Sequence, residues 1–292
     1  MSATHSALAG VSAADKVEKL LAIDTSRPYN PNLPTQEHPY DGIRLENISF
    51  SYRGRGAALK DVSIDIPKGK STALVGLSGS GKSTVAALLM RFYDPEQGRI
   101  LIEGRDVTSM TPDELRRHII MVPQTVSLYS GTVAENLRMA APDASDGELL
   151  EVLREVRLDN WIAAQPEGLN TPVGDAGEKL SGGQRQKIGI ARALLCKAEY
   201  IIFDEATSSV DMDSEQEIWN CINDISGSKT LIIISHRLST IQNADIIYVL
   251  ENGVISQSGT HETLMSRGGL YRSLVYEQEK LEKLGEEREE NA

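Results

Sequence analysis

The stretch that decides the fold is GLSGSGKST, residues 76–84, which lies between the apolar run TALV (72–75) and the helix-like run VAALLMRF (85–92). Its spacing fits G-x-x-x-x-G-K-[ST], the pattern of a loop that cradles phosphate groups. Glycine allows backbone angles that other residues avoid, so successive N–H groups can turn inward around a polyphosphate. For this motif alone, the alternative is a flexible turn. We expect a strand, a phosphate-binding loop and a helix.

The same loop supplies the groups that are expected to hold the phosphates. The helix that follows presents N–H groups and the positive end of its dipole to an anion. Lys82 can reach the β- and γ-phosphates of a nucleotide, and the Ser83 hydroxyl can ligate Mg²⁺. The predicted nucleotide-binding residues of the loop are Ser78, Gly79, Ser80, Gly81, Lys82, Ser83 and Thr84.

A second apolar run, YIIFDE at 200–205, ends in two adjacent carboxylates, Asp204 and Glu205. Open α/β sheets bind ligands at the carboxyl ends of their parallel strands. One carboxylate can hold Mg²⁺, usually through water, and its neighbour can orient a water against the γ-phosphate. A solvated strand end is the alternative for this pair alone. Together with the phosphate loop, the pair favours a nucleotide-hydrolysing site.

The composition is that of an ordinary globular protein without a broad nucleic-acid-binding face. Of the 292 residues, 40% are hydrophobic and 25% are charged, and the formal net charge is −12. Because phosphate neutralisation needs clustered Lys and Arg, this acidic chain is expected to bind phosphate locally, through the loop. Cys196 and Cys221 lie in apolar helical patterns, and we expect buried thiols in a reducing compartment. The sequence shows neither a long apolar run nor a leader pattern, so we expect no membrane span in this segment and no secretion.

The pattern along the chain predicts four regions. Residues 1–24 end in a segment with helical spacing, and residues 25–42, with four prolines, are an extended linker. Residues 43–276 form the main domain, with a helical part at about 125–190. Residues 277–292 are a charged, solvated helical tail. In the main domain, strands at 43–52, 57–66, 72–75, 98–104, 119–123, 200–205 and 230–235 alternate with helices, including 184–196 and 214–224, which predicts a parallel α/β sheet with one helical insertion.

The most specific motif is KLSGGQRQ at 179–186, a second glycine-rich entry to a helix and hence a second anion-binding helix N-terminus. With this motif, residues 43–276 closely resemble the nucleotide-binding domain of an ATP-binding cassette (ABC) transporter. The resemblance implies a P-loop NTPase (RecA-like) core with a mainly parallel sheet, an antiparallel β subdomain and a helical signature subdomain. It also implies that LSGGQ of one domain closes over ATP held by the phosphate loop of a second domain.

Further motifs occur in the order typical of that family. By resemblance, Tyr52 in FSY stacks on adenine, Gln124 in VPQ contacts Mg²⁺ and the attacking water, and His236 in IIISHRL touches the γ-phosphate. SSVD at 208–211 resembles the loop that crosses the dimer interface. The resemblance thus predicts catalytic roles for Glu205, His236, Lys82 and Gln124, metal ligands at Ser83, Gln124 and Asp204, and ATP contacts from Tyr52, Ser181, Gly182, Gly183, Gln184 and Asp211.

The resemblance is to exporters in particular. TPVGDAGEKLSGGQ (171–184) is similar to the exporter segment that touches the membrane domain, with Asp175 where glutamate is usual. It implies an ATPase that drives transport, uses ATP and Mg²⁺, and pairs with a second nucleotide-binding domain as a homo- or heterodimer. It also implies transmembrane domains fused N-terminally, with residues 1–24 as the linker helix from them, and a place at the cytoplasmic face of the cell membrane. One alternative is a soluble ABC ATPase acting on nucleic acid or ribosomes, which the acidic balance disfavours. Another is a regulatory module that does not hydrolyse ATP, which Glu205 and His236 disfavour.

Overall fold

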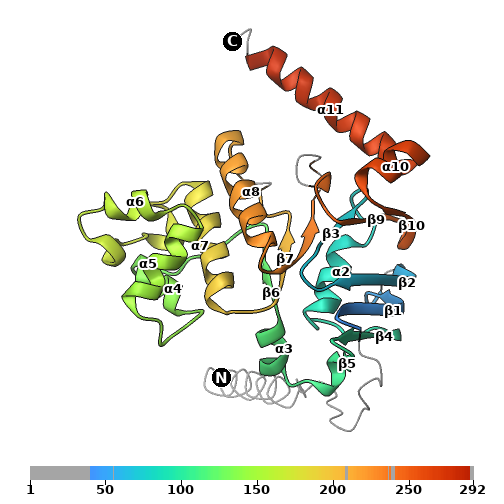
Figure 1. Cartoon of the computed structure of the whole chain (residues 1–292), viewed down its shortest axis with the longest axis horizontal. Coiled ribbons are helices and arrows are strands. Elements are labelled where there is room, and N and C mark those ends of the chain that lie inside the picture. Colours follow the sequence, from blue (N-terminus) through green and yellow to red (C-terminus); the bar gives the residue numbers. More distant parts are fainter. Residues whose placement is uncertain (1–39, 55, 208–209, 236, 238–240, 290–292) are drawn as a thin grey trace, which may run out of the picture.

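The computed structural model describes residues 40–54, 56–207, 210–235, 237 and 241–289 (Figure 1). Its described part is built on two sheets. The smaller is antiparallel, in the order β2-β1-β4-β5, and contains β1 (Gly42–Ser51), β2 (Ala57–Pro67), β4 (Gln97–Ile102) and the short β5 (Arg105–Asp106). The strands predicted at 43–52, 57–66 and 98–104 are therefore confirmed to within two residues.

A bulge in β1 explains how its apolar residues all reach one core. The register of β1 against β2 shifts between Leu45 and Ile48, and Asn47 at the bulge has φ 51°. Because side chains alternate between the two faces of a regular strand, the extra residue is what places both Leu45 and Ile48 on the buried face. Both are at most 1% exposed. They pack with residues of β2, β4 and the helix after the phosphate loop.

The larger sheet has six strands in the order β10-β9-β3-β8-β7-β6. Its strands are β3 (Ser71–Val75), β6 (Ile119–Val122), β7 (Tyr200–Asp204), β8 (Thr230–Ile234), β9 (Ile246–Glu251) and β10 (Val254–Gly259). All neighbours except β10 and β9 pair in parallel. Since β3 and β7 both flank β8, the loops that follow them emerge at the same edge of the sheet. This topology brings the phosphate loop and the carboxylate pair into one neighbourhood.

The helices lie around this larger sheet. Those near its strands are α2 (Lys82–Leu89), α3 (Pro112–His118), α8 (Met212–Ser226), α10 (His261–Arg267) and α11 (Leu270–Glu289). A separate group consists of α4 (Val133–Arg138), α5 (Asp146–Glu155), α6 (Asp159–Ala163) and α7 (Gly182–Leu195), and Figure 1 shows it on the far side of the sheet from α10. Its apolar residues, which include Leu137, Leu149, Leu153 and Ile188, form one cluster with residues of β7, β8 and α8. The α/β fold class, with its antiparallel sheet and helical signature group, is confirmed.

Two details of the sequence prediction were wrong. The helix predicted over 85–92 ends at Leu89, because Arg91 adopts φ 53° and its buried guanidinium donates to Asp94 Oδ1 and to the backbone carbonyls of Val107 and Met110. Cys196 is only half-buried, because it lies at the C-terminal end of α7, whereas Cys221 is buried as expected. Within the described ranges, no helix is long and apolar enough to cross a membrane.

Candidate functional site

The phosphate loop lies between β3 and α2, and its glycines are required by geometry. Gly76 has φ 146°, and a Cβ there would lie 2.2 Å from the carbonyl oxygen of Leu250. Gly81, the residue before α2, has φ 112°, and its Cβ would lie 2.9 Å from the carbonyl oxygen of Ala58. Side chains at either position would collide with backbone that cannot move aside. The loop therefore keeps its bare backbone open to the pocket.

Lys82 lies in the first turn of α2, and its ammonium group bends back over the loop. Its Nζ donates to the carbonyl oxygens of Gly76 at 2.8 Å and Leu77 at 3.0 Å. Burial lowers the pKa of Lys82, while the nearby Glu205 and Asp204 carboxylates raise it. A buried cation that is held by neutral carbonyl acceptors can exchange them for phosphate oxygens, which bind it more strongly.

Tyr52 follows β1, and its ring is held by other aromatic side chains. The centroid of its ring lies 5.0 Å from that of Phe50 and 5.2 Å from that of Tyr93, in both cases edge-to-face. Its hydroxyl hydrogen-bonds with Thr84 Oγ1 at 3.3 Å. Edge-to-face contacts with Phe50 and Tyr93 fix the plane of the Tyr52 ring without covering its face completely. A flat apolar ligand such as a nucleobase can stack on that face.

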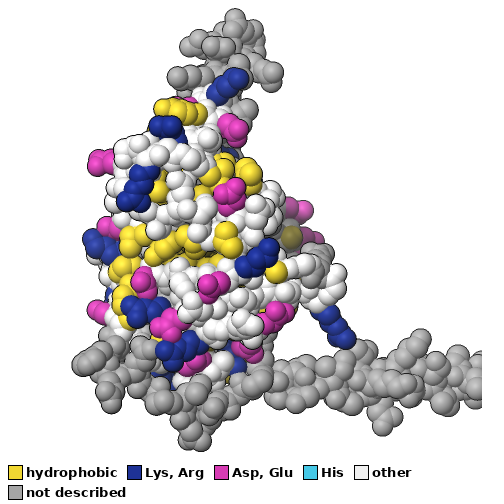
Figure 2. Space-filling model, turned by 90° about the vertical axis from the view of Figure 1, so that its right-hand side faces the viewer, with side chains coloured by type: hydrophobic (Ala, Val, Ile, Leu, Met, Phe, Trp, Pro, Cys, Tyr) yellow, Lys and Arg dark blue, Asp and Glu magenta, His cyan; other side chains and the backbone are white. Residues whose placement is uncertain are grey.

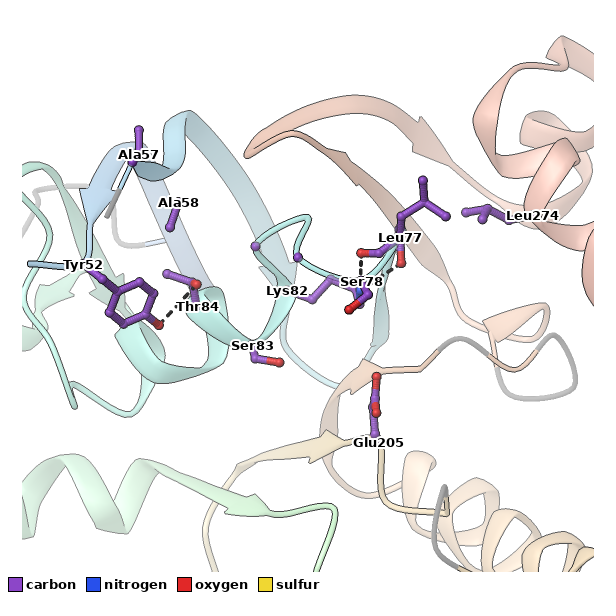
Figure 3. Close-up of a pocket in the computed structure, with 14 residues that line it drawn as sticks. Tyr52, Ala57, Ala58, Leu77, Ser78, Lys82, Ser83, Thr84, Glu205 and Leu274 are labelled. Atoms are coloured by element: carbon purple, nitrogen blue, oxygen red, sulfur yellow. Dashed lines mark hydrogen bonds between the residues drawn. The ribbon is translucent and has the colours of Figure 1, made fainter. Parts of the chain in front are cut away.

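The two carboxylates lie where β7 ends. Burial and the adjacent Glu205 raise the pKa of Asp204, while Lys82 lowers it. Glu205 adopts φ 48°, and its backbone N–H donates to the carbonyl oxygen of Ile234 at 2.8 Å. A left-handed backbone at a residue other than glycine is uncommon, and such residues concentrate at functional sites. This conformation turns the Glu205 side chain toward the phosphate loop (Figure 3).

One cavity of about 590 Å³ joins most of these groups (Figure 3). Its volume is within the range of small-molecule sites. Of the predicted residues, those that line it are Tyr52, Ser78, Gly79, Gly81, Lys82, Ser83, Thr84 and Glu205. Ser80 is buried beneath the loop, where its Oγ accepts a long hydrogen bond from Lys82 Nζ, at 3.5 Å. Tyr52 lies at one end of the cavity and Glu205 at the other, which suits a base with a phosphate chain.

Other predicted residues lie elsewhere among the described residues. Gln124 is exposed on the loop after β6, and Asp211 precedes α8, where its carboxylate accepts from the Ser214 N–H at 2.9 Å. Neither is among the residues that line the cavity. His236, together with Ser208 and Ser209, lies outside the described residues.

The LSGGQ segment also lies apart from the cavity, at the start of α7. The Ser181 hydroxyl accepts from the Gln184 N–H at 3.2 Å, while the Gln184 side chain accepts from the Ser181 N–H at 3.0 Å. This capping box fixes the first turn of α7 and leaves the serine exposed. None of residues 181–184 lines the described cavity. The helix entry that was predicted as a second anion cradle is therefore present, but within one chain it does not line the cavity of the phosphate loop.

Several lining residues were missed by the sequence analysis. Ala57 and Ala58 at the start of β2, Leu77 of the loop and Leu274 of α11 also line the cavity. Figure 3 shows Leu274 beside Leu77. Tyr93, which holds the Tyr52 ring, was missed as well. The small size of Ala57 and Ala58 was visible in the sequence, but their place beside the loop depends on β2 folding back over α2.

A magnesium ion would fit the end of the cavity near the carboxylates. Among the residues that the structure describes, Asp204 Oδ1 is buried and has no hydrogen-bond partner. A buried carboxylate oxygen without a donor is costly unless a ligand satisfies it. Ser83, on the first turn of α2, is exposed to the cavity and offers a hydroxyl oxygen, whereas Asp204 does not itself line the cavity and directly precedes Glu205, which does. Oxygen donors of this kind suit Mg²⁺.

Comparison with known proteins agrees with this geometry. The family model described as ABC transporter matches residues 59–208. The chain is 40% identical over 271 residues to the ATP-dependent lipid A-core flippase of Saccharophagus degradans, covering 92% of this chain and 46% of the relative. It is 45% identical over 260 residues to the mitochondrial iron-sulfur clusters transporter ATM1 of Saccharomyces cerevisiae, and this match covers 88% of this chain and 38% of the relative.

A solved structure is also similar. The structure of a bacterial Atm1-family ABC exporter with ATP bound superposes with a TM-score of 0.81 at 37% identity, covering 91% of this chain and 47% of that one. The chain thus spans less than half the length of each of these relatives. With its phosphate loop, carboxylate pair and LSGGQ helix on this fold, the chain belongs to the ABC transporter family, as an ATP-binding cassette domain with ATPase activity.

Proposed function

We propose that this chain is the motor domain of an exporter, in which ATP hydrolysis drives the movement of a substrate by transmembrane domains. The observation that carries the proposal is the single cavity that holds the phosphate loop, the Tyr52 ring and Glu205 together. The fold and the names of the relatives support the exporter class, since they include a flippase, a transporter and an exporter.

In this proposal, the chain's own groups divide the work between binding and chemistry. Tyr52 stacks on adenine, and the loop N–H groups with Lys82 neutralise the phosphates. Ser83 and Asp204, with Gln124 nearby in the closed state, would hold Mg²⁺, which when bound neutralises charge on the β- and γ-phosphates. Glu205 accepts a hydrogen bond from a water and orients it toward the γ-phosphate, while His236 donates to the phosphate.

The separation of the two cradles supports a shared active site. The LSGGQ segment, with Ser181, Gly182, Gly183 and Gln184, does not line its own chain's cavity, yet Ser181 is exposed at a positive helix end. A second cassette in the opposite orientation would bring its Ser181 to the γ-phosphate held by this chain, and Asp211 to the interface between them. One chain would then bind ATP but hydrolyse it poorly, and the partner is a second copy or a related cassette.

The exporter function that we propose also implies that the domain works at a membrane. We propose that transmembrane domains precede it in the full-length protein, that residues 1–24 and 25–42 connect to them, and that the cassette works at the cytoplasmic face of the cell membrane. A role on nucleic acid is disfavoured by the net charge of −12. On the face shown in Figure 2, basic and acidic side chains are interspersed, which is unlike a phosphate-binding surface.

The test is phosphate release by the purified chain with ATP and Mg²⁺. The wild-type chain is expected to release phosphate, and Glu205→Gln, which removes the carboxylate but keeps the size, is expected to bind ATP without cleaving it. Equal rates for the two chains would refute the assignment of Glu205. Stimulation by nucleic acid, without any effect of the transmembrane domains, would refute the exporter assignment.

A further inference from the structure

A chain of polar side chains joins the loop after β7 to the loop after β8, through helix α8. The indole N–H of Trp219 donates to the hydroxyl of Thr207 at 3.2 Å, and that hydroxyl donates to Glu215 Oε1 at 3.1 Å. The other oxygen of Glu215 forms an ion pair with the Arg237 guanidinium. Glu215 and Trp219 stand four residues apart on α8 and therefore on one face of it.

Three of these four side chains are buried, whereas the Arg237 side chain is 28% exposed. Thr207 is 2%, Trp219 5% and Glu215 7% exposed. A carboxylate that is removed from water is costly unless it is paired and hydrogen-bonded, and both oxygens of Glu215 have such partners. Trp219 donates to Thr207, which donates to Glu215, so these two bonds run in series and each polarises and strengthens the other. An arrangement of this kind holds its members in one geometry.

The two loops so joined are the ones that carry the catalytic groups. Thr207 is two residues after Glu205, and Arg237 directly follows His236 in the sequence. The backbone adds two further contacts: the Glu205 N–H donates to Ile234 at 2.8 Å, and the Arg237 N–H donates to the Ser235 hydroxyl at 3.0 Å. The left-handed Glu205 backbone, at φ 48°, needs surroundings that hold it. The hydrogen bonds and the ion pair of Glu215 supply these surroundings.

We infer that Glu215 is a positioning residue, which through Thr207 and Arg237 holds the loop of Glu205 in register with the end of β8 for hydrolysis. The inference rests on the proposed function, because it assigns Glu205 to the attacking water. Glu215 itself does not line the nucleotide cavity. Its loss should therefore lower the turnover number and leave ATP binding, which depends on the phosphate loop and Tyr52, nearly unchanged.

The experiment compares variants that break the contacts among Trp219, Thr207, Glu215 and Arg237 with variants that preserve them. Glu215→Gln removes the charge that Arg237 pairs with, and Thr207→Val removes the hydroxyl at nearly constant volume. Thr207→Ser keeps the hydroxyl and is the matched conservative variant. Asp224→Asn is the control on the same helix, because it breaks an ion pair with Arg157 whose side chains are 63% and 47% exposed.

For each variant, the turnover number, the dissociation constant of ATP and the melting temperature are measured, with rates divided by the number of chains that bind ATP. That division removes any unfolded fraction. Glu215→Gln and Thr207→Val should lose roughly 10- to 100-fold in turnover, with ATP affinity within about twofold of wild type. Thr207→Ser and Asp224→Asn should keep turnover within about threefold of wild type.

Amide hydrogen exchange of the ligand-free chain gives a readout without catalysis. In Glu215→Gln, peptides that contain the Glu205 and Arg237 amides should exchange about tenfold faster than in wild type, and in Asp224→Asn they should be unchanged. Wild-type turnover and exchange in both Glu215→Gln and Thr207→Val would overturn the inference while leaving the proposed function standing. A wild-type chain without ATPase activity would overturn both.

Discussion

Replacing Tyr52 by alanine should weaken ATP binding and leave the chemistry intact. The ring lies at the opposite end of the cavity from Glu205, and edge-to-face contacts with Phe50 and Tyr93 hold its plane (Figure 3). Stacking of aromatic groups contributes about 0.5–1.5 kcal/mol beyond burial. By the relation between free energy and affinity, that range corresponds to a roughly 2- to 12-fold weaker affinity for ATP.

Two further variants separate stacking from the other contacts of Tyr52. Tyr52→Phe loses the hydrogen bond to Thr84 but keeps the ring, so its affinity should stay within about twofold of wild type. Tyr93→Leu removes one of the two rings that hold Tyr52 and should give an intermediate loss. The assay is equilibrium binding of ATP together with steady-state hydrolysis, and the KM for ATP should rise while kcat stays constant.

Inorganic tripolyphosphate, which has no base, is the control ligand for these variants. Its affinity should be the same in wild type, Tyr52→Ala and Tyr52→Phe, because the phosphate loop alone holds it. Equal losses for ATP and tripolyphosphate would show that Tyr52 acts by supporting the loop through Thr84. A collapse of kcat with unchanged ATP affinity would refute the stacking role altogether.

Three other predictions concern the phosphate loop, Asp204 and Ser181. Gly76→Ala should lower the melting temperature by roughly 2–12 °C, because Gly76 has φ 146° and a Cβ there would lie 2.2 Å from the carbonyl oxygen of Leu250. Gly79→Ala, with open space around its Cβ, should lower the melting temperature measured by calorimetry less than Gly76→Ala does. Burial and Glu205 raise the pKa of Asp204, so its charged form destabilises the ligand-free chain above that folded pKa. Asp204→Asn should therefore raise the melting temperature at neutral pH, an advantage that disappears as pH falls through that pKa; a constant or reversed difference across a pH series would contradict it. Ser181→Asp keeps the helix cap but adds a negative charge, so ATP binding to one chain should persist while hydrolysis falls about tenfold or more; full activity would contradict a role for Ser181 at the γ-phosphate.

Motifs predicted the parts of the site that are continuous in the sequence. The phosphate loop, β3 and the carboxylate pair were all located from GLSGSGKST and YIIFDE, because each is a local backbone pattern with a fixed chemical purpose. The strand runs also gave the α/β class. The resemblance predicted that LSGGQ acts on the ATP of a second domain, and in the fold Ser181 is exposed and does not line its own chain's cavity.

Contacts between distant parts of the chain could not be predicted in the same way. Tyr93 and Leu274 follow no motif in the sequence, and the contact of Tyr93 with Tyr52 and the place of Leu274 at the cavity depend on how β1, α2 and α11 pack. The ion pair of Glu215 with Arg237 links residues 22 positions apart and has no local pattern. The early end of α2 depends on the backbone carbonyls that Arg91 reaches across to η1 (Val107–Ser109).

The central claim is that the cavity of one chain is only part of an active site that a second cassette completes. The most direct measurement is the ATPase rate per chain across a dilution series from nanomolar to tens of micromolar protein, at saturating ATP and Mg²⁺. The account predicts a rate per chain that rises with concentration and then levels off as pairs saturate. A rate per chain that is measurable and constant over the whole series would contradict the shared site.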